Sequence, residues 1–145
     1  MIIVMYTGLY SDDYLILSEK VRNTVMENSS FTRLSYSAPD VSFNGLFLKV
    51  NIHNMQIEQH YNKYKCIFQT FPNTQVIKSL TEIERRILDC YRTTKARVFN
   101  VREQLMSGNI KIFTYEKDVS IITLKISGIW ENETSCGLTF KFISD

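Results

Sequence analysis

Residues 46–52 read LFLKVNI, with an apolar side chain at every second position. Successive side chains of a β-strand point to opposite faces. The first, third, fifth and seventh of these residues would therefore share one face, and Phe47, Lys49 and Asn51 the other. An apolar face opposite a mixed face is typical of a strand that packs on a core with one side only. The stretch therefore predicts a half-buried strand.

The same alternation occurs elsewhere in the chain. Residues 55–71 indicate another strand, and three more are expected over 110–113, 122–126 and 138–142. The polar run 131–135 lies between the last two of these strands. We therefore expect those two strands to form a hairpin with an acidic tip.

Near the start of the chain, the apolar residues instead follow the spacing of an amphipathic helix. Leu17, Val21 and Val25 recur every four residues, and the polar run 11–13 before them offers N-capping side chains. This pattern predicts a helix of about three turns, which ends two residues after Val25.

A second helical region is expected in the middle of the chain. Residues 79–82, SLTE, match a capping box, so a helix is predicted to begin there. The apolar spacing continues to Leu105, with an interruption at residues 93–94, and Gly108 supplies a left-handed C-terminal position. One bent helix and two short helices both fit this pattern.

Together these elements predict an α+β fold. We expect a largely antiparallel sheet of about five to seven strands, with two or three helices packed on one face. The chain has 145 residues, of which 44% are hydrophobic, and it contains only 5 Gly and 2 Pro. A chain of this size without a linker or repeat fits a single domain over residues 1–145.

The overall composition excludes several classes of protein. The 17 basic and 15 acidic residues give a net charge of +2, so the chain is no polyelectrolyte. Its 3 cysteines are far apart, which suits reduced thiols. The apolar start is too short for a signal peptide, and no run reaches the roughly 18 apolar residues of a membrane span. We expect an intracellular protein, cytoplasmic or nuclear, without a membrane partner.

Motifs for catalysis or metal binding are weak. The chain has neither the closely spaced glycines of a phosphate-binding loop nor the Gly-x-Ser-x-Gly of a serine hydrolase. With Cys66, the histidines His53 and His60 would form at most a Cys-His pair or part of a zinc site. An apolar neighbourhood such as that of Cys66 is more typical of an inert core thiol, and Asp12 and Asp13 fit helix caps better than a cation site. The sequence therefore predicts no enzymatic activity, no metal and no cofactor.

Positive charge is concentrated in the middle of the chain. Residues 62–117 contain 11 basic and 5 acidic residues, whereas the segments on either side are slightly acidic. Basic side chains neutralise phosphates, and aromatic rings stack on unpaired bases. The basic candidates are Arg85, Arg86, Arg92, Lys95, Arg97, Lys63 and Lys65. The candidate stacking platforms are Tyr61 and Tyr64.

We therefore predict a non-enzymatic protein that binds nucleic acid, single-stranded DNA or RNA, on a basic and aromatic surface. Lys49, Lys111 and Lys125 would extend this surface if the strands place them beside Lys63 and Lys65.

Several alternatives stay open. The same arginines fit an outer helix face that is solvated or paired with glutamates. They also fit a helix-turn-helix whose second helix enters a major groove. The alternative function class is a protein-interaction or self-assembly module, in which exposed strand edges pair between copies to make a dimer or a virion component.

Two stretches near the C-terminus carry a resemblance to known sequences. Residues 124–130, LKISGIW, and 137–142, GLTFKF, are similar to the end of small predicted proteins encoded by large DNA viruses of invertebrates, with 108–113, GNIKIF, as further support. The resemblance covers about one fifth of the chain. It implies a viral setting, and hence a compartment of a host cell, but it assigns no activity and no site residue.

Overall fold

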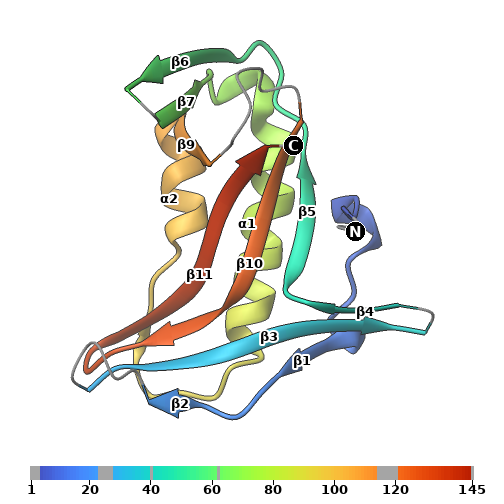
Figure 1. Cartoon of the computed structure of the whole chain (residues 1–145), viewed down its shortest axis with the longest axis vertical. Helices are drawn as coiled ribbons and strands as arrows, with labels where there is room; N and C mark the ends of the chain where they lie inside the picture. Colours follow the sequence, from blue (N-terminus) through green and yellow to red (C-terminus); the bar gives the residue numbers. More distant parts are fainter. Residues whose placement is uncertain (1–3, 23–27, 40, 62, 114–120, 145) are drawn as a thin grey trace.

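The computed structural model describes residues 4–22, 28–39, 41–61, 63–113 and 121–144. Within these residues two α-helices, α1 (Thr74–Asp89) and α2 (Asn100–Ser107), lie on one face of a large sheet (Figure 1). The strands are, in chain order, β1 (Leu15–Leu17), β2 (Val21–Arg22), β3 (Ser30–Ala38), β4 (Val41–Asn44), β5 (Leu46–Val50), β6 (Gln56–His60), β7 (Lys63–Ile67), β8 (Ala96–Arg97), β9 (Asn109–Phe113), β10 (Ile122–Glu131) and β11 (Ser135–Ser144). Short 3-10 turns cover Thr7–Leu9, Asp12–Tyr14 and Phe71–Asn73.

The described strands form one sheet of eleven strands. Its main path runs β1-β3-β10-β11-β9-β7-β6; β5 pairs with β10, β2 and β4 pair with β3, and β8 pairs with β11. Among these pairings, β11 with β8 and β11 with β9 are parallel, and the others are antiparallel. The predicted α+β class is confirmed, but the expected number of about five to seven strands is wrong. Alternation misses very short strands such as β2 and β8, which have two residues each.

The segment predicted to form the first helix is instead a 3-10 turn followed by two short strands. Ser11 does accept a hydrogen bond from a backbone N–H two residues later, but no α-helix follows. β1 pairs antiparallel with β3, with Leu15 opposite Tyr36. An isolated helix of three turns is marginally stable in water, so pairing with a long neighbouring strand overrides the four-residue spacing. Val25 lies outside the described residues.

The central helices differ from the prediction in their boundaries. The 3-10 turn Phe71–Asn73 leads directly into α1, so this helix begins at Thr74. Residues 79–82 therefore lie inside the helix and form no capping box. Residues 90–99, which include β8, separate α1 from α2, so there are two helices, joined by a longer connection than a helix-turn-helix uses. Gly108 ends α2 with a φ of 70°, as predicted.

The strand predicted over residues 55–71 is a hairpin of β6 and β7 followed by a 3-10 turn. Tyr61, at the hairpin turn, has a φ of 56°, in the left-handed region that two-residue hairpin turns require. The predicted C-terminal hairpin is confirmed, because β10 and β11 pair antiparallel, with Glu131 opposite Cys136 beside the acidic tip.

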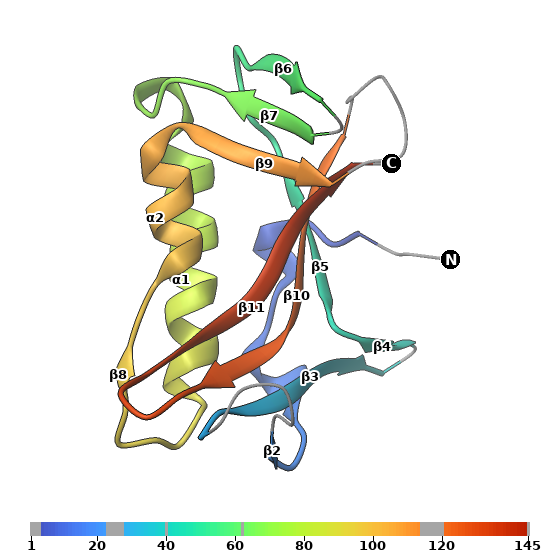
Figure 2. The same ribbon diagram turned by 60° about the vertical axis from the view of Figure 1, so that its left-hand side comes forward.

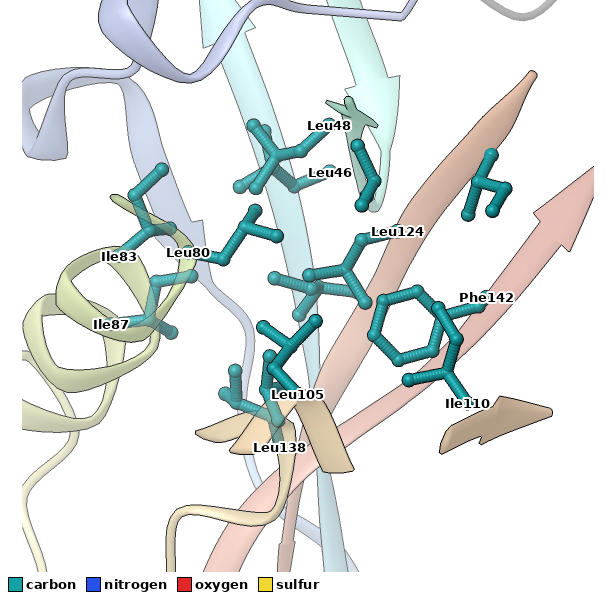
Figure 3. Packing of buried hydrophobic residues seen from close by; sticks show 14 of the residues in the cluster. Leu46, Leu48, Leu80, Ile83, Ile87, Leu105, Ile110, Leu124, Leu138 and Phe142 are labelled. Atoms are coloured by element: carbon teal, nitrogen blue, oxygen red, sulfur yellow. The ribbon is translucent and has the colours of Figure 1, made fainter. Parts of the chain in front are cut away.

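The core lies between the helices and the inner face of the sheet. Figure 3 shows leucines and isoleucines of α1 facing those of β5 and β10, with Phe142 of β11 packed among them. Each fully buried side chain of this size contributes about 1.5–3 kcal/mol. Cys66 belongs to this core, and burial raises the pKa of its thiol to about 11. A buried thiol of this kind is chemically inert.

β10 changes its neighbour at Gly128. Its first half pairs with β5 and its second half with β3, and its register with β11 shifts between Ile126 and Gly128. A Cβ at Gly128 would meet the carbonyl oxygen of Thr32 and would lie 2.6 Å from the ring of Phe31. β3 can therefore approach this closely because Gly128 has no side chain.

Gly128→Ala is expected to destabilise the protein by about 2–3 kcal/mol, because backbone rather than a flexible side chain stands in the way of the new methyl group. Urea unfolding measures the change. Gly8→Ala is the matched control, since a Cβ at Gly8 meets nothing within 4 Å, and its stability should stay within about 0.5 kcal/mol of the wild type. Equal stability of the two variants would contradict the close approach of β3.

A buried carboxylate joins the two helices. Glu84 of α1 is fully buried and accepts hydrogen bonds from the backbone N–H groups of Val101, at 2.9 Å, and Arg102, at 3.0 Å. Phe99, at the N-cap of α2, provides no side-chain cap, so Glu84 satisfies the first turn of α2 from another helix. Burial raises the pKa of the Glu84 carboxyl, against the opposing effect of these two hydrogen bonds.

Candidate functional site

The two predicted arginines of α1 are held by carboxylates. Arg85 forms ion pairs with Glu82 and Asp89 of the same helix. Arg86 donates to Asp12 at 3.0 Å. Such exposed pairs contribute little to stability, but they occupy donors that a phosphate would need.

Two predicted cations after α1 bind backbone carbonyl groups. Arg97 donates to the carbonyl oxygens of Leu88, at 3.0 Å, and Tyr91, at 3.1 Å, and so satisfies the C-terminal end of α1. Lys95 donates to the carbonyl oxygen of Glu133 at 2.9 Å. The donors of Arg97 and Lys95 are therefore occupied by hydrogen bonds within the chain.

Arg92 differs from the other four, because its side chain is exposed and forms no hydrogen bond or ion pair with a described residue. The five cations on and after α1 therefore do not combine into one free positive surface.

The two predicted stacking platforms also differ from each other. Tyr61 is 96% exposed at the β6–β7 turn, whereas Tyr64 is 8% exposed and belongs to the core, on the same side of β7 as Cys66.

The lysines of the sheet, in contrast, are brought together. In β5, β7, β9, β10 and β11 the residues that alternate with these lysines are buried against the helices. The lysines therefore lie on the opposite face, which we call the open face. Figure 2 shows this face as the side of the sheet away from α1 and α2. The open-face lysines are Lys49, Lys63, Lys65, Lys111, Lys125 and Lys141.

Four of these lysines follow one another across neighbouring strands. Lys125 of β10 is opposite Lys141 of β11, and Lys111 of β9 is opposite Lys65 of β7. The parallel pairing of β11 with β9 places Lys141 beside Lys111, one residue before the paired positions 142 and 112. The result is a row of four lysines across four adjacent strands.

The two ends of this row carry different side chains. Phe47 of β5 is opposite Lys125, and Glu58 of edge strand β6 is opposite Lys65. Among the described residues of the row, Glu58 is the acidic one, and it lies at the outer edge of the sheet. The four lysines between these ends have no carboxylate among them.

A second row runs beside the first, two residues further along each strand. Lys49 of β5 is opposite Thr123 of β10, which is opposite Ile143 of β11, and Ile143 is opposite Phe113 of β9. Thr123 is buried, with an exposed fraction of 2%, and its hydroxyl has no hydrogen-bond partner among the described residues. Lys63 of β7 follows at the far end. The second row is therefore more apolar and has lysines at its two ends.

Aromatic rings lie within reach of the open-face lysines. The Nζ atoms of Lys111 and Lys141 lie 4.8 Å and 5.8 Å from the centre of the Phe113 ring. The Lys49 Nζ lies 5.0 Å from the centre of the Tyr6 ring. Phe113 and Tyr6 both keep much of their surface exposed, so their rings are accessible beside the charges.

Lysines on neighbouring strands of the open face repel one another. None of the six open-face lysines forms an ion pair or a hydrogen bond with a described residue. Like charges on directly opposite strand positions repel each other, and the row contains three such contacts in succession. The open face is therefore suited to a ligand that carries several negative charges.

The sequence alone placed some of these residues and missed others. Lys63 and Lys65 were predicted site residues, and Lys49, Lys111 and Lys125 were predicted to extend the surface if the strands met. Lys141 and the rings of Phe47 and Phe113 were missed. Alternation in the last strand could have found Lys141, because it lies between the apolar residues 140 and 142.

The described residues carry no cluster of three or more histidine, cysteine, aspartate or glutamate side chains that could hold a metal ion. Among the helices of the described chain, none is both long and apolar enough to cross a membrane. The side chain of His60 is not described, and His53 contributes its backbone N–H and carbonyl to the Asn73 side chain.

No protein-family model matches this chain, and no curated protein or solved structure was found to be similar to it. The viral setting and self-assembly through strand edges therefore stay predictions. What the fold and the charge arrangement define is an α+β protein whose sheet is covered by helices on one face and carries lysines on the other.

Proposed function

We propose that the open face binds single-stranded nucleic acid without catalysing a reaction on it. The observation that carries this proposal is the row Lys125, Lys141, Lys111 and Lys65, in which four cations are adjacent and have no ion-pair partner among the described residues. A chain of phosphates would neutralise these lysines and remove their mutual repulsion. The arginines of α1, in contrast, already have carboxylate partners within the part of the chain that the structure describes.

The rings beside the lysines favour a single strand over a duplex. Phe113 of β9 is 46% exposed, Tyr6 before the first 3-10 turn is 59% exposed, and Tyr61 is almost fully exposed at the end of β6. Unpaired bases stack on such rings, whereas the bases of a duplex are already stacked on each other. A sheet surface that combines basic and aromatic side chains can therefore hold both the phosphates and the bases of one strand.

Lysine contacts to phosphates imply a low sequence preference. An ammonium group acts as a point charge, and phosphate contacts carry no direct information about the base. Stacking on a ring is also tolerant of sequence. We therefore expect oligothymidine and oligouridine of equal length to bind with similar affinity.

The affinity for a single strand should depend steeply on salt. If all six open-face lysines contact phosphates, the logarithm of the binding constant falls with the logarithm of the salt concentration with a slope of about −4. Fluorescence anisotropy of a labelled oligothymidine of about 16 nucleotides, between about 50 and 200 mM salt, measures this slope. Absence of binding at about 50 mM salt, or a slope near zero, would contradict the proposal.

Two controls test whether the oligonucleotide binds at the open face and whether the rings take part. Arg92→Glu reverses an exposed charge away from the open face and should leave the slope unchanged, whereas Lys125→Glu should reduce its magnitude by about 0.7. A duplex of the same length tests the role of the rings. Equal affinity for duplex and single strand would show that stacking makes no contribution.

A further inference from the structure

A groove lies on the helical side of the molecule, away from the open face. It is formed between α1, α2 and the 3-10 turn before α1, and it has a volume of about 540 Å³. Its floor includes Ile77 of α1, which is buried, while Phe71 and Met106 form parts of its walls. The groove follows the line along which the two helices pack together.

The apolar walls of the groove are unusually exposed. Phe71 is 89% exposed and Met106 is 53% exposed, so two large apolar side chains face water at the same groove. Neither is needed to fill the core. Apolar side chains gathered at a concave surface and bordered by polar residues mark interaction sites, and methionine adapts easily to the shape of a partner.

The border of the groove is positively charged. Lys78 of α1 and Arg102 of α2 lie on its two sides, and neither side chain forms a hydrogen bond or an ion pair with a described residue. Glu82 also borders the groove, but its carboxylate is engaged by Arg85. Two cations on opposite helices therefore flank an apolar strip, and they complement a partner with acidic side chains on either side of an apolar stripe.

We infer that this groove binds an amphipathic helix of a partner protein, with the apolar stripe of that helix against Phe71 and Met106 and its acidic residues near Lys78 and Arg102. A helix laid into a groove between two helices is a common mode of peptide recognition. A second copy of this chain is a poor occupant, because the apolar faces of its α1 and α2 are already buried in its own core.

This binding site is independent of the nucleic-acid site. The groove and the open-face lysines lie on opposite sides of the sheet, so both can be occupied at once. Variants in the groove should therefore leave oligonucleotide binding unchanged, and variants on the open face should leave helix binding unchanged. Failure of one proposal is thereby distinguishable from failure of the other.

The test is a selection on the full chain from a displayed library of amphipathic helices. The apolar stripe of each helix is randomised, and its flanks carry either glutamate or lysine. We expect glutamate-flanked helices to be enriched, and Phe71→Ala and Met106→Ala each to weaken their binding about tenfold. Both replaced side chains are exposed, so thermal unfolding of the variants should match that of the wild type.

A charge swap provides the sharper readout. In the double variant Lys78→Glu with Arg102→Glu, the preference should reverse, so that lysine-flanked versions of the enriched helices bind more tightly than the glutamate-flanked ones. Lys125→Glu with Lys141→Glu, on the open face, is the matched control and should keep the original preference. The inference is overturned if no helix is enriched, if binding survives Phe71→Ala unchanged, or if light scattering shows that the groove variants abolish a dimer instead.

Discussion

Reversing the charges of Lys111 and Lys141 is expected to weaken oligonucleotide binding about a hundredfold at about 0.1 M salt. These two lysines occupy the middle of the row on the open face, and both lie near the ring of Phe113. Losing one phosphate contact on a single strand lowers the affinity about fivefold at this salt concentration, and an added carboxylate repels the phosphates further. Lys111→Glu with Lys141→Glu therefore combines two lost contacts with two repulsions.

The same double variant should be at least as stable as the wild type. Each new carboxylate lies beside a remaining lysine of the row, Lys125 in one case and Lys65 in the other. Two of the three repulsive contacts therefore become attractive, while the contact between positions 111 and 141 stays repulsive. We expect a gain of about 0.5–1 kcal/mol in the free energy of unfolding. Loss of binding together with a gain of stability is typical of residues that serve a ligand and not the fold.

Anisotropy titration and urea unfolding of the same protein samples measure both effects. The control is Lys78→Glu with Arg92→Glu, which changes the net charge equally at exposed positions away from the open face. This control should bind the oligonucleotide within about threefold of the wild type, since positions 78 and 92 lie outside the strands that carry the row and salt screens their charges. If the control loses as much affinity as the open-face variant, binding depends on total charge and the proposed site is wrong.

Glu84→Ala is expected to destabilise the protein by about 3 kcal/mol, the largest effect on stability that we predict. The substitution removes the acceptor of two backbone N–H groups in the first turn of α2, near Val101, where little water can replace it. A buried donor left without a partner costs about 1–3 kcal/mol. Urea unfolding measures the loss, and Glu103→Ala, an exposed acidic residue in the same turn, should change stability by less than about 0.5 kcal/mol. Similar values for the two variants would contradict the capping role of Glu84.

The conservative variant Glu84→Gln adds a test by pH. Burial raises the pKa of the Glu84 carboxyl above its ordinary value of 4.5, so the folded protein holds this proton more tightly than the unfolded chain does. The stability that protonation contributes is fully present below the unfolded pKa and is lost as the pH rises through the folded pKa. The wild type should therefore gain stability relative to Glu84→Gln as the pH falls from neutral toward 4.5. A difference that is independent of pH would show that burial does not affect this carboxyl.

Sequence reasoning succeeded where the signal was local. Alternation found β5, β9, β10 and β11 and the hairpin of the last two, and Gly108 was recognised as the end of α2. It failed for the first predicted helix, because Leu17 and its neighbours obtain their partners from β3, whose residues follow later in the chain. It also missed Glu84, because a carboxylate that caps another helix leaves no periodic signature.

In the candidate site, too, the sequence predicts local features but not contacts between distant segments. Positive charge is concentrated in the middle third of the sequence. Arg86 of that third is nevertheless paired with Asp12, 74 residues earlier in the chain, and no local pattern indicates this pair. Lys49 and Lys141 are 92 residues apart in sequence and lie on the same face of the sheet, since β10 pairs with both β5 and β11.

The amino-acid sequence by itself determined which side of each strand carries its lysines, because the alternation of side chains is set by the backbone of that strand alone. Only the tertiary structure decided that the strands lie in the order β5, β10, β11, β9 and β7, and hence that the lysines form one row. Strand order depends on pairings between distant segments and on the core that they enclose together. For that reason the arginines of α1 have carboxylate partners within the chain, while the open-face lysines have no ion-pair partner among the described residues.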